Sequence, residues 1–221
     1  MTRVELTTED NIQIVGNYFP AGKDNAPAVI LLHMMPARKE SWNDFAPILV
    51  KKGFQVLAID ERGHGESTQG GELNYQEFTD KQQQEKKLDV HAAREFFREK
   101  DVPLESIFVG GASIGANLAL EYIAENFEAK AGFALSPGYN YMGIEALSLI
   151  EETHTGQSVF LAAAKNDPNV PDSWHAVEDL SKNGLAEKEV RIFEKGGHGT
   201  DMFDEHEELM TELADWLTNF K

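Results

Sequence analysis

Short apolar runs alternate with longer segments of helical spacing along almost the whole chain. Residues 11–19 alternate apolar and polar positions, which predicts an early antiparallel strand. The runs at 28–33 and 54–60 are mainly apolar, as strands buried on both faces of a sheet require. Further strands are expected at residues 106–111, 131–136, 158–164 and 189–194.

Helical patterns lie between and after these strands. The helix predicted at 85–100 carries Leu88, Ala92 and Phe96 on one stripe. The helix predicted at 113–127 turns four apolar side chains inward, those of Ile114, Leu118, Tyr122 and Ile123. Further helices are expected at 41–52, 141–151, 172–183 and 203–219. This alternation predicts right-handed crossovers and a mostly parallel sheet with helices on both faces, which is the α/β class.

Length and composition indicate a globular protein with one sizeable core. The 221 residues suit a single domain over residues 1–221, and 41% of them are hydrophobic. The chain has no cysteine, which excludes disulfides, thiolate zinc sites and a cysteine nucleophile. No apolar stretch resembles a signal peptide or reaches 18 residues, so we expect no membrane insertion and a cytoplasmic location.

The net charge of the chain argues against some classes of binding partner. A formal net charge of −18 should repel nucleic acid and anionic membranes, which favours a small-molecule partner. Residues 201–215 hold seven acidic and no basic side chains, as on the solvent face of a last helix. The sequence leaves the oligomeric state open.

Polar residues follow several of the predicted strands. Open α/β sheets bind ligands at the carboxyl ends of their strands, so these positions are the ones to search for function. Ser113 follows the strand at 106–111, Asp167 follows 158–164, and His198 follows 189–194. Asp172 is a rival for the acidic position, although its place before the helix at 172–183 is typical of an N-cap.

The surroundings of Ser113 fit a sharp strand-to-helix turn. Such a turn crowds the residues two before and two after it, and glycines stand at 111 and 115. The helix that follows would point its free N–H groups at the site, where negative charge can develop. A glycine-rich helix start packed against a strand would give the same pattern. Likewise, His198 could cap a helix and Asp167 could be an ordinary turn residue.

Together these motifs resemble the α/β-hydrolase family, over about residues 11–219. The order Ser113, Asp167, His198 is the order that nucleophile-elbow hydrolases use. The resemblance implies an eight-stranded, mostly parallel sheet, without the large cap that some members insert. The segments that carry it are "LLHMMPARKESW", "DERGHGES", "GGASIG", "KNDPNVP" and "GGHGT".

The resemblance also implies roles for individual residues. Ser113 would be the nucleophile, His198 the general base, and Asp167 the carboxylate that orients the imidazole. Backbone N–H groups of Met34 and Ile114 would form the oxyanion hole. The family commonly has His-Gly where this chain has His33-Met34, but the N–H group survives that change. Met35 would line an acyl pocket.

The expected activity is hydrolysis of carboxylic esters of short to medium acyl chains, with no cofactor and no metal. Alternatives are a thioesterase, a cofactor-free haloperoxidase-like enzyme, and a non-catalytic ligand-binding protein of the same fold. Dienelactone hydrolases are similar in size, but their usual cysteine nucleophile is absent here. Residues 66–84 are either a mobile flap over the site or a solvated connector.

The remaining histidines receive no catalytic or metal role. His33 and His64 lack the partner spacing of metal ligands, and we expect His33 to form hydrogen bonds to loops beneath the site. Asp60, Arg62 and His64 are expected to hold their own loop by charge-assisted bonds.

Overall fold

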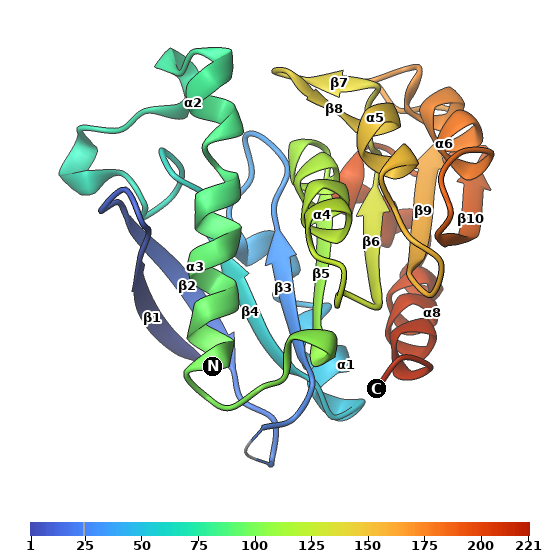
Figure 1. Ribbon diagram of the computed structural model, residues 1–221. Helices are drawn as coiled ribbons and strands as arrows, with labels where there is room; N and C mark the ends of the chain where they lie inside the picture. The colour runs from blue at the N-terminus through green and yellow to red at the C-terminus, as the bar shows by residue number, and fades with distance from the viewer. Residues whose placement is uncertain (24) are drawn as a thin grey trace.

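An eight-stranded sheet forms the centre of the protein (Figure 1). The computed structural model describes residues 1–23 and 25–221. The strand order is β1-β2-β4-β3-β5-β6-β9-β10. Pairing is antiparallel between β1, β2 and β4 and parallel in the rest of the sheet. The strands are β1 (Thr2–Thr7), β2 (Gln13–Phe19), β3 (Ala28–Leu32), β4 (Gln55–Ile59), β5 (Ile107–Ala112), β6 (Ala131–Leu135), β9 (Ser158–Ala164) and β10 (Glu187–Phe193).

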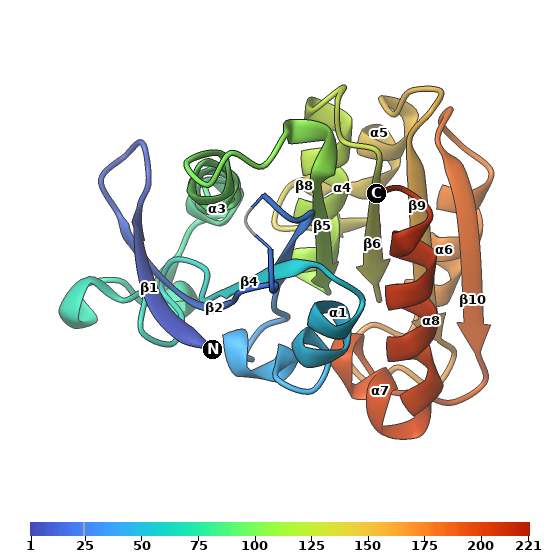
Figure 2. The ribbon, with the colours of Figure 1, turned by 90° about the horizontal axis from the view of Figure 1, so that it is seen from below.

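Helices cover both faces of this sheet, as Figure 2 shows from below. On one face lie α3 (Lys87–Arg98), α4 (Ile114–Glu125), α5 (Ala146–Glu151) and α6 (Ser173–Ser181). On the other lie α1 (Ala46–Lys51), α7 (Met202–Glu205) and α8 (Glu207–Thr218). The helix α2 (Asp80–Gln84) precedes α3. The predicted α/β-hydrolase fold, with its mostly parallel sheet, is thereby confirmed.

The continuous apolar runs became the central strands because both of their faces are covered. Every residue of β3, β4, β5, β6 and β9 is buried. On the face of α1 and α8 the core is rich in aromatic side chains, including Trp42, Phe45, Phe108 and Phe133. Burial of such large side chains is the main favourable term in folding.

Two of the predicted helices are each divided into two shorter helices in the structure. The segment 41–52 begins as a 3₁₀ helix, Lys39–Trp42, and becomes α-helical only at α1. Pro47 lies in the first turn of α1, where its missing N–H costs nothing. The segment 203–219 is divided into α7 and α8 at His206, whose φ and ψ of −133° and 69° are not helical.

The stripe predicted for the helix at 85–100 is wrong by about one residue. Leu88, Ala92 and Phe96 are only partly buried. The fully covered face of α3 instead carries Asp89, Val90, Ala93 and Phe97. Asp89 turns inward because it forms an ion pair with Arg62, at 2.8 Å between Oδ1 and Nε. The covered face thus combines the apolar residues Val90, Ala93 and Phe97 with this buried ion pair, and Ala92 and Phe96 pack at its margin.

The segment 141–151 is helical only in its second half. Its start forms a small hairpin of two short strands, β7 (Asn140–Tyr141) and β8 (Ile144–Glu145), followed by α5. Met142 and Gly143 at its tip have φ of 53° and 87°, values that a helix does not contain. Residues 66–84 contain two 3₁₀ turns, Gln69–Gly71 and Tyr75–Glu77, and then α2.

Candidate active site

Ser113 lies at a strained corner between β5 and α4. Its φ and ψ are 57° and −122°, in a region that non-glycine residues rarely adopt. A Cβ atom at Gly111 would overlap the carbonyl group of Gly115, and one at Gly115 would lie 2.6 Å from the Leu32 oxygen. The predicted need for glycine at both positions is therefore confirmed. Side chains there would push the nucleophile helix off the sheet.

Asp167 and His198 are joined directly. His198 Nδ1 lies 2.6 Å from Asp167 Oδ2, and both side chains are almost fully buried. The other carboxylate oxygen, Oδ1, accepts the N–H groups of Asn169 and Val170, each at 2.9 Å. Burial raises the pKa of Asp167, but the hydrogen bonds from His198 and the backbone outweigh it and hold that pKa below its usual value. Asp167 is thus an anchored anion facing the imidazole.

The rival carboxylate Asp172 is placed elsewhere. It is the N-cap residue of α6, as its position in the sequence predicts, and its side chain makes no cap hydrogen bond. Its Oδ1 lies 3.7 Å from Nδ1 of His175, an exposed residue of the same helix. The acidic partner of His198 is therefore Asp167.

The loop of His198 reaches the end of β5. A Cβ on Gly199 would lie 3.0 Å from Cβ of Ala112, the residue before Ser113. The N–H of Gly199 donates to Ser136 Oγ at 2.9 Å, which ties the same loop to the end of β6. Among the described residues no hydrogen bond joins Ser113 Oγ to His198 Nε2. Such bonds are often long without substrate and tighten when it binds.

The segment after β3 lies against both the nucleophile helix and the histidine loop. A Cβ at Gly115 would also lie 2.8 Å from the carbonyl oxygen of His33, so the first turn of α4 contacts the backbone next to Met34. The Met34 sulfur would lie 2.8 Å from a Cβ at Gly199. Ile114 is fully buried, while Met34 and Met35 are half-buried.

His33 fixes this segment from below, as expected from the sequence. Its Nε2 accepts the N–H of Glu61 at 3.1 Å, so Nδ1 carries the proton and donates to the Met34 carbonyl at 3.0 Å. Its ring packs edge-on against that of His64, with 4.7 Å between centroids. The backbone that follows His33 is therefore positioned by the loop after β4.

Buried charges hold that loop in turn. Lys86 and Glu61 are fully buried and lie 2.9 Å apart between Nζ and Oε2. Burial and the Lys86 ammonium depress the pKa of His64 far below its usual value, so its neutral Nε2 can accept from Lys86 Nζ at 3.2 Å.

The expected charge-assisted bonds of Asp60 and Arg62 are also present. Asp60 accepts from Lys39 Nζ at 2.6 Å, and Arg62 binds Asp89 and Asp10. A lysine at position 86 gives no sequence signal of burial, so sequence reasoning missed its role.

A surface cavity opens beside the loop that follows β3. Its volume is about 680 Å³, and Met34, Ile48 and Phe203 contribute apolar walls. Met210 adds a fourth apolar residue, and the remaining lining is polar and mostly acidic, from Ser41, Asp44, Thr200, Asp201, Asp204 and Glu207. Negative charge at its edge would disfavour anionic ligands.

Sequence reasoning also missed two residues at the end of β6. The carbonyl of Ser136, which is fully buried, accepts a hydrogen bond from the Tyr141 hydroxyl at 3.1 Å. That hydroxyl also interacts with the hydroxyl of Ser113. Burial raises the pKa of Tyr141 to about 12, against the smaller opposite effect of Ser113. The signal for Ser136 was its place directly after a buried strand.

The described residues contain neither a membrane-spanning helix nor a cluster of metal ligands. Over residues 1–23 and 25–221, no helix is both long and apolar enough to cross a bilayer. In the same part of the chain, no group of three or more histidine or acidic side chains is arranged to hold a metal ion.

The fold and this arrangement of strand-end residues define the class: the protein is an α/β hydrolase. The model of the family described as serine aminopeptidase, S33, matches residues 23–150, which is more than half of the chain. The chain therefore belongs to this family of α/β hydrolases.

Individual relatives match over short segments. The bifunctional esterase/perhydrolase DCH of Acinetobacter calcoaceticus is 38% identical over 64 residues, which are 29% of this chain and 22% of that protein. Epoxide hydrolase A of Mycobacterium tuberculosis is 46% identical over 48 residues, which are 22% of this chain and 15% of that protein. The matched segments thus span less than a quarter of these two relatives.

Similarity to solved structures extends over the whole fold. The Pyrococcus furiosus esterase Pf2001 superimposes with a TM-score of 0.78 at 21% identity, over 99% of this chain and 92% of that chain. Est1E of Butyrivibrio proteoclasticus with bound ferulic acid gives a TM-score of 0.79 at 16% identity, over 98% of each chain. At these identities the likeness establishes the fold.

Proposed function

We propose that this protein is a serine hydrolase of carboxylic esters that works through an acyl-enzyme. Ser113 Oγ attacks the ester carbon while His198 Nε2 takes its proton. His198 then protonates the leaving alcohol, and water activated by the same histidine releases the acid. The observation that carries the proposal is the 2.6 Å bond between His198 and an anchored Asp167, across from a serine at a strained corner.

Asp167 has two tasks in this scheme. It holds Nδ1 of His198 so that Nε2 faces the nucleophile, and it stabilises the imidazolium that forms during attack. Because two backbone N–H groups already fix the carboxylate, little reorganisation is needed when the imidazole becomes charged.

A fluorophosphonate probe tests this function directly. We expect the wild-type protein to be labelled, peptide mass spectrometry to place the label on Ser113, and the Ser113→Ala variant to stay unlabelled. A folded wild-type protein that hydrolyses no ester and takes no label would favour the non-catalytic alternative.

The substrate class follows from the short connection after β6. The 22 residues 136–157 between β6 and β9 are taken up by the hairpin, α5 and their turns, so they supply no long helical cap to enclose an acyl chain. We therefore expect nitrophenyl acetate and butyrate to give higher kcat/KM than the palmitate ester. The reverse order, measured below the micelle concentration of the long ester, would contradict this assignment.

The oxyanion hole is proposed to consist of the N–H groups of Met34 and Ile114, with Met35 lining the acyl pocket. The contact between α4 and the backbone of His33 supports this pairing, because it brings the two segments together. Met34→Pro deletes one donor and should lower kcat by about 10²- to 10³-fold. Met34→Leu keeps the N–H and should remain close to wild type. Full activity in folded Met34→Pro protein would remove Met34 from the mechanism.

Perhydrolysis is a second candidate, favoured by the esterase/perhydrolase among the relatives. In that reaction hydrogen peroxide replaces water: its oxygen bonds to the acyl carbon, the bond to Ser113 Oγ breaks, and a peroxy acid leaves. Peroxy acid formed from ester and hydrogen peroxide, and lost in Ser113→Ala, would establish it.

A further inference from the structure

The hairpin after β6 is fixed to the nucleophile helix by a buried asparagine. Asn117 stands one turn after Ser113 on α4 and is fully buried. Its Nδ2 donates to the carbonyls of Gly138 and Ile144 at 3.0 and 2.8 Å, and its Oδ1 accepts the N–H of Gly138 at 3.2 Å. Both ends of the hairpin are thus held by one satisfied side chain, which makes the hairpin a rigid platform.

This platform places the Tyr141 ring against Gly138. A Cβ at position 138 would lie 2.7 Å from Tyr141 Cζ and 3.1 Å from its hydroxyl oxygen, so only glycine leaves room for the ring. The hydroxyl then donates to the Ser136 carbonyl at 3.1 Å. Ser136 follows Leu135, whose carbonyl accepts the N–H of Ser113 at 2.9 Å, so the Tyr141 hydroxyl lies beside the corner at Ser113. Because its pKa is raised to about 12, Tyr141 keeps its proton at neutral pH and remains a donor.

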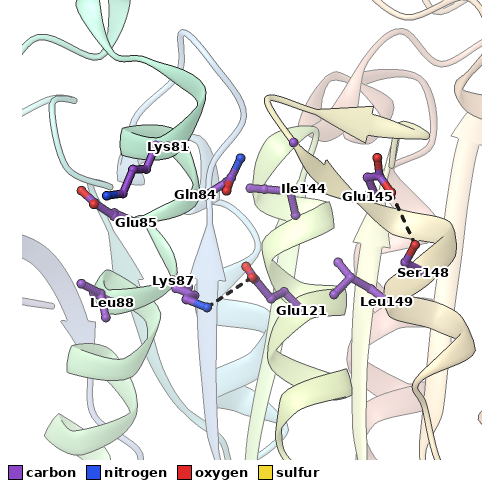
Figure 3. A pocket seen from close by; sticks show the side chains of 11 residues that line it. Lys81, Gln84, Glu85, Lys87, Leu88, Glu121, Ile144, Glu145, Ser148 and Leu149 are labelled. Carbon is purple, nitrogen blue, oxygen red and sulfur yellow. Dashed lines mark hydrogen bonds and ion pairs between the residues drawn. The ribbon is translucent and has the colours of Figure 1, made fainter.

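Sheet order puts this donor opposite the oxyanion loop. β5 lies between β3 and β6 (Figure 1), so the loop with Met34 and the hairpin with Tyr141 follow the two strands that flank the strand of Ser113. The outer side of the hairpin is occupied separately. There Gln84 Nε2 donates to the Met142 carbonyl at 2.9 Å, and a cavity of about 450 Å³ opens between Gln84, Ile144 and Glu121 (Figure 3). Tyr141 is not part of that cavity's lining.

We propose that Tyr141 is a further catalytic residue, whose hydroxyl donates a hydrogen bond to Ser113 Oγ while that oxygen carries negative charge. The inference rests on the proposed ester hydrolysis. As the bond from Oγ to the acyl carbon forms, the Ser113 proton passes to His198 Nε2, and the carbonyl electron pair moves onto the oxyanion. Tyr141 keeps its own proton and only turns it from the Ser136 carbonyl toward Ser113 Oγ.

The same donor acts again when the acyl-enzyme breaks down. The bond between Oγ and the acyl carbon breaks, and Tyr141 stabilises the leaving oxygen until His198 returns the proton to it. A phenylalanine would fill the seat on Gly138 equally well. It would lack the hydroxyl, which donates to the buried Ser136 carbonyl in the structure and, in this proposal, to Ser113 Oγ during the reaction.

The test is Tyr141→Phe, which removes one oxygen and keeps the ring. We expect kcat to fall about 10- to 100-fold, as for loss of a hydrogen bond to a charged oxygen, with KM unchanged. The rate constant of fluorophosphonate labelling should fall by the same factor, because the same oxygen attacks that reagent. A merely structural tyrosine would leave the labelling rate unchanged in a folded variant.

Tyr139→Phe is the matched control. Tyr139 lies two residues earlier, is exposed, and donates its hydroxyl to Asp179 Oδ2 at 2.7 Å, away from the nucleophile. It should keep wild-type kcat and labelling rate. Thermal unfolding of both variants shows whether each one folds.

A second variant keeps the hydroxyl but displaces it. The added methyl group of Gly138→Ala displaces the Tyr141 ring, so this variant should also lower kcat. In a Tyr141→Phe background the hydroxyl is already absent, so Gly138→Ala should lower kcat no further. Wild-type kcat and labelling in folded Tyr141→Phe would overturn the inference, as would additive losses in the double variant. A wild-type protein without esterase activity or labelling would instead overturn the proposed function, and the inference with it.

Discussion

Replacing Ser113 with alanine is expected to lower kcat for ester hydrolysis by roughly 10⁴- to 10⁶-fold, the scale on which loss of a catalytic serine acts. Without Oγ no acyl-enzyme can form, and His198 has no nucleophile to activate. What remains is the contribution of the oxyanion donors and of substrate binding. Initial rates with nitrophenyl butyrate, corrected for contaminating esterase, measure the effect.

The control is Ser148→Ala on the exposed side of α5, where the serine hydroxyl donates only a long hydrogen bond, 3.5 Å, to Glu145 Oε2. It should keep wild-type kcat. Thermal unfolding should show that Ser113→Ala is folded, because alanine retains the Cβ and loses no recorded hydrogen bond to His198. The expected residual rate of Ser113→Ala is far below about one hundredth of the wild-type rate. Ester hydrolysis above that level would exclude Ser113 as the nucleophile.

Replacing Lys86 with methionine is expected to lower the free energy of unfolding by about 3–5 kcal/mol, because it leaves the Glu61 carboxylate buried without its cation. The substitution also removes the donor to His64 Nε2, and so loosens the loop that holds His33. Urea unfolding followed by tryptophan fluorescence measures the loss.

Its neighbour provides the control. Lys87 is 42% exposed and lies 3.3 Å from the exposed Glu125, so Lys87→Met should cost less than about 1 kcal/mol. The double variant Lys86→Met with Glu61→Gln should recover part of the loss, because it removes the stranded charge. If Lys86→Met were as stable as Lys87→Met, the buried pair would have no role in holding the loop.

The central strands could be predicted from sequence because burial on both faces leaves a continuous apolar run. β1 was not predicted, because its apolar face has only two residues, Val4 and Leu6, and a run this short and polar is not distinguished from a loop. The hairpin at 140–145 was predicted as helix for a similar reason. Its strands have two residues each, and its shape depends on contacts from Asn117, which is distant in sequence.

Only some residues of the candidate site could likewise be predicted from the sequence. Ser113, Asp167 and His198 could be singled out because each follows a predicted strand of the parallel part of the sheet, and parallel strands bring their carboxyl ends to one edge. Tyr141 follows no strand of the main sheet, and its approach to Ser113 depends on how the hairpin folds back. Lys86 became buried because the loop after β4 offers it Glu61 and His64, a tertiary effect that no local pattern of hydrophobicity records.

The backbone conformation of Ser113 lowers the stability of the fold, whereas the proposed reaction needs the serine hydroxyl at this position. A non-glycine residue in such a backbone conformation costs about 1–3 kcal/mol, out of the 5–15 kcal/mol by which domains are typically stable. Glycine would occupy the corner at lower free energy, so selection for folding alone would favour it there. A chain that retains a hydroxyl-bearing side chain at this point gives up thermal tolerance for chemistry.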